Sequence, residues 1–358
     1  MSDISAGPPE SDADGWPTAR PDTMGLDAAH LEPLGAHFFN WSAANVHAVL
    51  MAKNGALVYE QYFSGPDRSW EKALGTVHFN RRTLHDVRSI TKSIVSLLCG
   101  VAHSNGLLPD LDATVFELLP EYQDLATQGK DRITVRHLLT MSAGLAWNED
   151  IPYHHEANSE RQMAAAPDPI RYALSQPLIR DPGAAYTYNG GATAVLGAIL
   201  ERLAQRPLDR YAESAMLSPL GIDAYEWIRF STGQPMAASG LRMRARDVAK
   251  IGQLVLGRGL WQGNKILPTA WIDDATAPSI NGAGLYFYGY HWWLGRSLVR
   301  RKEVRWIAAV GYGGQRLYIV PDYDLVLVVL AGLYDDPELQ NVVGDVVLRR
   351  YALSAAVE

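Results

Sequence analysis

Strand-like segments occur near both ends of the chain, and helix-like segments fill most of the sequence between them. Residues 47–52 and 56–62 are apolar and alternating enough to form two strands, and Lys53-Asn54-Gly55 between them is typical of a hairpin turn. The C-terminal part returns to strand patterns in three segments, at 288–293, 315–320 and 325–330. This order predicts an α/β protein whose antiparallel sheet is assembled from both termini and flanked by helices.

The central region has apolar residues at spacings of three and four, the pattern of amphipathic helices. Helices are expected there at 90–102, 135–141, 170–174, 192–203 and 245–256, and outside it at 26–39 and 337–353. We therefore divide the chain into three parts, with the active site in the cleft between the last two. These are a flexible N-terminal arm at 1–20, an α/β domain formed by 21–84 and 266–358, and an all-helical subdomain inserted at 85–265.

The charge balance argues against nucleic acid as a partner. The net charge is −7, and phosphate binding requires a basic face that this sequence does not provide. No apolar run approaches the roughly 20 residues that a membrane helix needs, and the first residues lack the basic and apolar regions of a secretory signal. We expect a cytoplasmic protein whose partner is a small molecule, with no membrane partner. The sequence leaves open whether the protein forms a homo-oligomer.

The sequence offers no obvious metal or disulfide chemistry. Cys99 is the only cysteine, so an intramolecular disulfide or a cysteine-rich metal site is excluded. It lies in the apolar run 94–101 and is expected to be a buried, unreactive thiol. His154 and His155 lack a helical HxxxH spacing and a third ligand nearby, so we interpret them as loop histidines. No metal and no cofactor are expected.

Ser89 and Lys92 stand one helical turn apart at the start of the helix expected at 90–102, so their side chains share a face. A lysine takes a proton from a serine hydroxyl only if desolvation or nearby positive charge lowers its pKa. The SxxK spacing alone is a weak signal, because Ser69-Trp70-Glu71-Lys72 also has it, in what looks like a polar loop. A helix cap with a solvated lysine is the alternative on this segment alone.

Two longer segments resemble the class C β-lactamase-like, or penicillin-recognising, serine hydrolases. Ser-Ile-Thr-Lys-Ser at 89–93 is similar to the nucleophile helix of that superfamily, and Ile-Thr-Val-Arg-His-Leu-Leu-Thr-Met-Ser-Ala-Gly-Leu at 133–145 resembles the helix and turn that follow it. The resemblance extends over about residues 45–335. It implies a β-lactamase/transpeptidase-like fold in which Ser89 is the acylated nucleophile and Lys92 helps to activate it.

The segment Pro-Gly-Ala-Ala-Tyr-Thr-Tyr-Asn-Gly at 182–190 is similar to the second element of the superfamily, PGxxFxYSN. Counting from Pro182, the resemblance implies that Tyr188 shares a proton with Lys92, and leaves Tyr186 as a packing aromatic, although the two tyrosines could exchange roles. Asn189 stands where a small residue is usual. By resemblance, Tyr186 and Asn189 line the substrate site, together with Trp147 from the polar stretch 147–158.

The segment Ala-Val-Gly-Tyr-Gly-Gly-Gln at 309–315 takes the place of the third element, normally KTG or HTG on a strand that lines the cleft. Aligned backwards from Pro321, the basic residue has become Ala309, so strong β-lactamase activity is not expected. Gly311 and Gly313 would let a substrate lie against the strand. The backbone N–H groups of Ser89 and Tyr312 would form the oxyanion hole. The glycine pattern is most similar to 6-aminohexanoate-dimer hydrolases and family VIII esterases.

These resemblances together predict an SxxK serine hydrolase that cleaves a small ester or a linear amide through an acyl-Ser89 intermediate. Within catalysis, the alternatives are a D-amino-acid peptidase and a weak β-lactamase. Outside catalysis, the alternative is a ligand-binding descendant of the fold without activity. The co-occurrence of Ser89, Lys92 and Tyr188 argues against that last alternative, because a pure binding role gives no reason for all three side chains.

Overall fold

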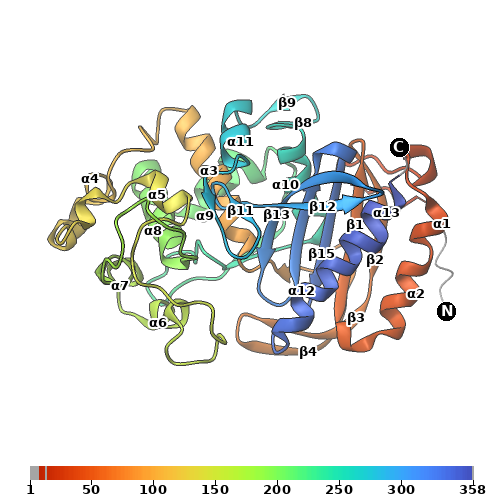
Figure 1. The fold of residues 1–358 in the computed structure, drawn as a ribbon, viewed down its shortest axis with the longest axis horizontal. Helices are drawn as coiled ribbons and strands as arrows, with labels where there is room; N and C mark the ends of the chain where they lie inside the picture. The colour runs from red at the N-terminus through yellow and green to blue at the C-terminus, as the bar shows by residue number, and fades with distance from the viewer. Residues whose placement is uncertain (1–7, 13, 357–358) are drawn as a thin grey trace.

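The computed structural model describes residues 8–12 and 14–356, and an eight-stranded antiparallel sheet dominates it (Figure 1). The N-terminal strands β1 (Val46–Lys53) and β2 (Ala56–Tyr62) form one edge of this sheet, because β1 pairs with the C-terminal strand β15 (Leu325–Ala331). The order is β10-β11-β12-β13-β14-β15-β1-β2. The other five strands are β10 (Ile280–Asn281), β11 (Phe287–Tyr288), β12 (Trp293–Val299), β13 (Lys302–Gly311) and β14 (Gln315–Val320). The predicted sheet, built from both termini, is confirmed.

Both faces of the central strands are covered, which explains their nearly continuous apolar sequence. Along β15, Val326 and Val328 point into the core that contains α3 (Ile90–Ser104) and α10 (Ala245–Leu256). The alternate residues Leu325 and Leu327 point into a second core on the opposite face. The elements of that face are α1 (Ala28–Leu31), α2 (Pro33–Asn40), α12 (Pro337–Asp345), the π-helical turn Val346–Ala352 and α13 (Leu353–Ala355).

Several predicted elements are divided in the structure. The helix expected at 26–39 is two helices, because Pro33 has no N–H to continue the first one and instead begins the second. The strand expected at 288–293 is interrupted between β11 and β12, where His291 has a φ of 63°. The family resemblance implied a strand only at the end of β13, from residue 309, because the first half of β13 is rich in charged residues and has no strand pattern. The Ser69 to Lys72 segment is the turn of a second hairpin, β3 (Ser64–Ser69) and β4 (Lys72–His78).

The helical region gathers beside one end of the sheet, on the left in Figure 1. Its helices are α4 (Val115–Leu118), α5 (Val135–Leu139), α6 (Ser159–Ala165), α7 (Pro169–Ser175), α8 (Gly190–Ala204) and α9 (Leu208–Ala212). α10 is different, because it packs on β1, β14 and β15. The predicted boundary at residue 265 therefore assigns α10 to the helical part, whereas the structure places it on the sheet.

Part of the N-terminal arm expected to be flexible, residues 1–7 and 13, lies outside the described residues. The described part is held against β2: Leu57 N–H donates to Pro17 O at 2.8 Å, and Ala19 N–H donates to Leu57 O at 3.0 Å. Trp16 is 2% exposed. From residue 14 onward the arm is therefore packed rather than loosely attached. In the part of the chain that the structure describes, no helix has the length and apolar character needed to cross a membrane.

The close approach of α10 to the sheet depends on Gly252. A Cβ at this position would lie 2.6 Å from Val326 Cγ1 and 2.7 Å from Leu317 Cδ1, both in the core. We predict that Gly252→Ala lowers the free energy of unfolding by about 1–3 kcal/mol, because overpacking outweighs the better helix propensity of alanine. Urea unfolding of the two proteins measures this difference. A stabilised variant would contradict the described packing.

Candidate active site

Ser89 is held at the start of α3 by a short sheet that joins three distant parts of the chain. The strands are β5 (His85–Asp86), β7 (Leu241–Met243) and β6 (Tyr225–Trp227), and Val87 N–H continues the pairing by donating to Leu241 O at 3.0 Å. Arg88 then turns the chain into the helix with a φ of 49°, a left-handed conformation that costs energy for a residue with a side chain. Ser89 is thereby exposed to a cleft of about 500 Å³.

Lys92 lies directly beside Ser89, as the helical spacing predicts. Its Nζ donates to Ser89 Oγ at 2.9 Å and to Ala238 O at 3.1 Å, and the residue is 1% exposed. Within the described residues, the Ser89 side chain makes no capping hydrogen bond to the helix. The alternative of a helix cap with a solvated lysine is therefore wrong for this pair, because the lysine is buried and the hydroxyl binds the lysine.

The two tyrosines of the 182–190 segment occupy different places. Lys92 Nζ lies 4.9 Å from the centroid of the Tyr188 ring, and a hydrogen bond from Ser89 acts to lower the pKa of Tyr188. Tyr186 packs edge-on against Tyr288 and Trp293, at centroid distances of 5.1 and 5.9 Å. The structure therefore brings Tyr188 to the serine and lysine, and leaves Tyr186 as a wall of the cleft.

The pKa of Lys92 is shifted in the direction opposite to the one that a lysine base requires. Burial acts to lower its pKa, but Tyr188 and the carboxylates of Glu149 and Glu160 raise it, and the net pKa lies above that of a free lysine. Burial also raises the pKa of Tyr188, against the effect of Lys92. The lowered pKa that a lysine base requires is therefore not present in this structure, because the negative groups outweigh the desolvation. At neutral pH Lys92 is therefore an ammonium.

Two buried carboxylates lie at the cleft: Glu160, which sequence reasoning missed, and Glu149, which belongs to the stretch 147–158 expected to reach the cleft but was not assigned a role. Glu149 Oε1 accepts hydrogen bonds from Trp147 Nε1 at 2.6 Å and from Gly190 N–H at 2.7 Å. Burial, opposed by Lys92, raises the pKa of Glu149 to about 7. Glu160 is buried and accepts a hydrogen bond from Ser239 Oγ. No spacing in the sequence separates these two carboxylates from exposed neighbours such as Asp150.

Six predicted residues line the cleft: Ser89, Trp147, Tyr186, Tyr188, Gly311 and Tyr312. Gly311 has a specific reason to be glycine, because a Cβ there would overlap Val87 O. The end of β13 can therefore lie directly against the segment that carries Ser89. Tyr153 belongs to the stretch 147–158 that was expected to reach the cleft. Other lining residues were not predicted, namely Arg88, Glu160, Ser239, Trp293, Arg316 and Asn341.

Three predictions for individual positions are wrong. Asn189 does not face the cleft: it is 3% exposed, and its Oδ1 caps α8 by accepting from Ala192 N–H at 3.0 Å. Gly313 faces the ring of Tyr334 rather than the cleft. Ala309 lies in the core, because side chains alternate along a strand and its neighbour Val310 takes the cleft side. A missing basic residue at 309 therefore says nothing about the cleft, whose walls include Arg88 and Arg316.

A second hollow of about 430 Å³ adjoins the cleft. The two share Trp293, Val310, Arg316 and other residues of their common wall, while Tyr286, Trp306 and Tyr318 line only the second. The cleft beside Ser89 thus continues past Trp293 into a hollow with aromatic walls. Cys99 lies away from both hollows, and burial raises the pKa of its thiol to about 12, which agrees with an unreactive thiol.

The comparisons with known proteins identify the family. The Beta-lactamase family matches residues 43–342, so the chain belongs to this family of hydrolases. Among curated relatives, the 6-aminohexanoate-dimer hydrolase of Paenarthrobacter ureafaciens is 24% identical over 286 residues, which are 72% of this chain and 68% of the relative. Esterase EstB of Burkholderia gladioli is 26% identical over 287 residues, 74% of this chain and 69% of the relative. A solved family VIII carboxylesterase has a TM-score of 0.67 at 16% identity, over 91% of this chain and 96% of that one. The resemblance noted in the sequence is confirmed.

The capping role of Asn189 predicts a change in stability rather than in substrate affinity. Asn189→Ala should lower the free energy of unfolding by about 1 kcal/mol, because α8 loses its side-chain cap. Asn189→Ser should keep both the stability and the KM of the parent protein, because serine also caps. If Asn189→Ser had normal stability and a KM raised about tenfold, the result would support the substrate contact predicted from the sequence.

The carboxylate of Glu149 should set the pH at which Lys92 loses its proton. Since the negative charge raises the pKa of Lys92, Glu149→Gln should lower that pKa and move the ascending limb of the kcat/KM profile to lower pH, by about one unit. The shift should be present above pH about 7, where Glu149 is ionised, and fade below it. Glu156→Gln, an exposed change outside the cleft, is the matched control. An ascending limb that stays in place would show that Glu149 does not act on Lys92.

Proposed function

We propose that this protein is an SxxK serine hydrolase, an esterase or amidase that cleaves a small ester or a linear amide through an acyl-Ser89 intermediate. The observation that carries this proposal is the hydrogen bond of 2.9 Å between Lys92 Nζ and Ser89 Oγ, beside Tyr188 and in a cleft of about 500 Å³. A hydroxyl of ordinary pKa needs such a partner before it can attack a carbonyl carbon.

In the proposed acylation step, Ser89 Oγ attacks the carbonyl carbon, and its proton passes to the Lys92–Tyr188 pair. The pair returns that proton to the leaving alcohol or amine as the carbon–oxygen or carbon–nitrogen bond breaks. Water then attacks the acyl ester and Ser89 regains its proton. Since the pair can accept a proton only after losing one, and the pKa of Lys92 is raised, we expect activity to increase toward alkaline pH.

The backbone N–H groups of Ser89 and Tyr312 are the proposed oxyanion hole. The close approach that Gly311 permits supports this proposal, because it brings the start of the β13–β14 turn to the nucleophile. Each donor of such a pair is worth about 3 kcal/mol of transition-state stabilisation in other hydrolases. For the substrate, the two adjoining hollows and their aromatic walls favour an extended, partly apolar acyl or leaving group over a compact polar one.

The first test compares three substrates: a short p-nitrophenyl ester, a linear 6-aminohexanoate dimer and a chromogenic penicillin-like lactam. We expect turnover of the ester or the linear amide. Ser89→Ala and Lys92→Ala should each lower kcat/KM by about 10³-fold or more, because the two side chains act as a unit. The same Ser89→Ala protein should fail to react with a fluorophosphonate probe.

Ser69→Ala is the matched control, because Ser69 and Lys72 have the same spacing but lie across the turn of the β3–β4 hairpin. It should keep full activity and labelling. Hydrolysis or labelling that survives Ser89→Ala would refute the proposed nucleophile. A folded wild-type protein that turns over none of the three substrates and takes no label would favour a ligand-binding role instead.

A further inference from the structure

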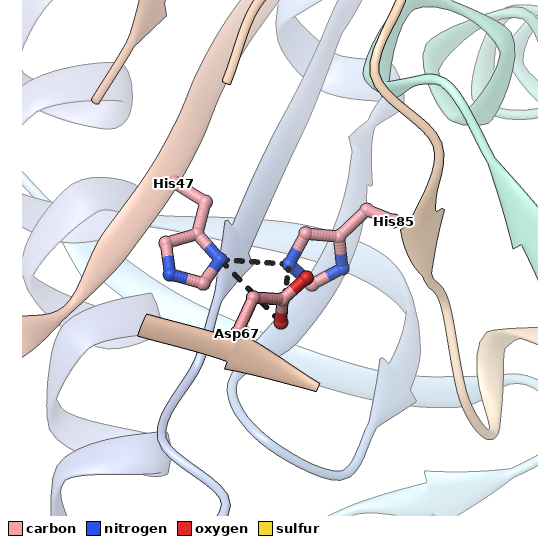
Figure 2. A group of neighbouring side chains, drawn as sticks. All are labelled: His47, Asp67 and His85. Carbon is pink, nitrogen blue, oxygen red and sulfur yellow. Dashed lines mark hydrogen bonds and ion pairs between the residues drawn. The ribbon is translucent and has the colours of Figure 1, made fainter. Parts of the chain in front are cut away.

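Three buried side chains from separate strands converge at one point in the structure (Figure 2). They are His47 on β1, Asp67 on β3 and His85 on β5, and their exposed fractions are 0%, 3% and 1%. His47 Nδ1 lies 2.8 Å from His85 Nε2, and the two nitrogens lie 3.9 and 3.7 Å from Asp67 Oδ1. The three residues, here called the His47 cluster, play no part in the proposed reaction.

The outer nitrogen of His47 is fixed as a hydrogen-bond donor by Asn45. The Asn45 side-chain nitrogen donates to Pro66 O at 2.9 Å and to Gly332 O at 3.0 Å, so its amide orientation is set. Its oxygen therefore faces His47 Nε2 at 3.1 Å and accepts a hydrogen bond from the Nε2–H group. In the neutral imidazole this leaves Nδ1 of His47, which points into the cluster, with a free lone pair.

The ring nitrogen of His85 that points away from His47 is also fixed as a hydrogen-bond donor. Its Nδ1 lies 2.9 Å from Asp86 O, and a carbonyl oxygen can only accept, so Nδ1 carries the proton. The neutral ring then has a lone pair on Nε2, directed at the lone pair of His47 Nδ1 only 2.8 Å away. Two facing lone pairs repel each other, and a cation between them removes that repulsion.

The cation is either a proton or a metal ion. The facing nitrogens are the first reason to expect a metal ion, because one ion can accept the lone pairs of both rings. Asp67 adds a second reason. Its Oδ1 lies 3.3 Å from the Tyr334 hydroxyl, whereas its Oδ2 is buried with no hydrogen-bond partner among the described residues. The negative charge of this buried carboxylate is therefore poorly compensated, and a metal ion bound through Oδ1 would neutralise it.

We propose that His47, Asp67 and His85 bind one divalent transition-metal ion, with Zn²⁺ the best match to their chemistry. Two neutral imidazoles and one carboxylate are a standard ligand set for zinc. The ligand atoms of a tetrahedral site lie about 3.3 Å apart, given metal–ligand bonds of about 2.0 Å. The three observed separations, 2.8, 3.7 and 3.9 Å, lie on both sides of that value.

The surroundings of the cluster match those of a metal site. Histidine ligands of metals commonly donate their other ring N–H to an amide or carbonyl oxygen, as both rings do here. Room for this arrangement comes from glycines, because a Cβ at Gly65 or Gly332 would overlap Asn45 or His47. The three side chains supply three of the four positions of a tetrahedral ion, and since all three are buried, the ion would hold strands together rather than meet a substrate. It would link β1, β3 and β5, and its ligand on β5, His85, lies four residues before Ser89. This inference does not depend on the proposed reaction.

The test uses the full chain, freed of metal with a chelator and dialysed, and titrated with Zn²⁺ alone. We expect about one equivalent to bind, and the midpoint of thermal unfolding to rise by about 4 °C at saturation. Asp67→Asn and His85→Gln should each weaken binding by about 100-fold or more. The double variant His154→Gln/His155→Gln, which removes two exposed histidines, should bind zinc as the wild type does, and excludes surface binding.

Co²⁺ gives a second readout that needs no variant to fold. The wild-type protein loaded with Co²⁺ should show the intense visible bands of a tetrahedral site, and one equivalent of Zn²⁺ should remove them. A folded wild-type protein that binds no Zn²⁺ and gains no thermal stability from it would overturn the proposal and leave a proton-bridged pair of histidines. Full zinc affinity in a folded Asp67→Asn protein would overturn it equally.

Discussion

The buried ammonium of Lys92 is the interaction on which the rest of the site depends. A charge removed from water is tolerated only if it is paired and hydrogen-bonded. Ser89 Oγ and Ala238 O accept its hydrogen bonds, while Glu149 and Glu160 supply negative charge nearby. These partners come from α3, the 238–241 segment and the helical region, so each part must be in place for the charge to be stable. The hydrogen bonds and charges around Lys92 therefore also keep the parts that form the cleft in contact.

The sheet and the helical region meet at the segment just before Ser89. Asp86 accepts hydrogen bonds from Arg242 Nε at 2.7 Å and from Trp70 N–H at 2.6 Å, which joins β5 to β7 and to the β3–β4 hairpin. Gly311 brings β13 against Val87 from the other side. The His47 cluster adds β1 to this junction. The nucleophile is therefore positioned by long-range contacts, although the residues around it in the sequence form an ordinary helix start.

Local patterns predicted much of the fold. The strands of the two termini, the helices at 90–102 and 245–256, and the pairing of Ser89 with Lys92 all follow from periodicity and helical spacing, and the family resemblance selected Tyr188. Errors arose where a residue's role depends on tertiary contacts. Asn189 sits in a binding motif but caps α8, and Ala309 falls on the core side of its strand. The charges of Glu149 and Glu160, and the meeting of His47, Asp67 and His85, have no local signature.

The most direct test of the central claim is to trap the acyl-enzyme. Wild-type protein mixed with excess p-nitrophenyl ester is quenched in acid within milliseconds to seconds, digested, and analysed by mass spectrometry. The account predicts that the acyl mass increase appears on the peptide that contains Ser89, with about one acyl group per chain, and that it decays as substrate is exhausted. Turnover of the same ester with the acyl group on another residue, or with no acyl-protein at any time, would contradict it.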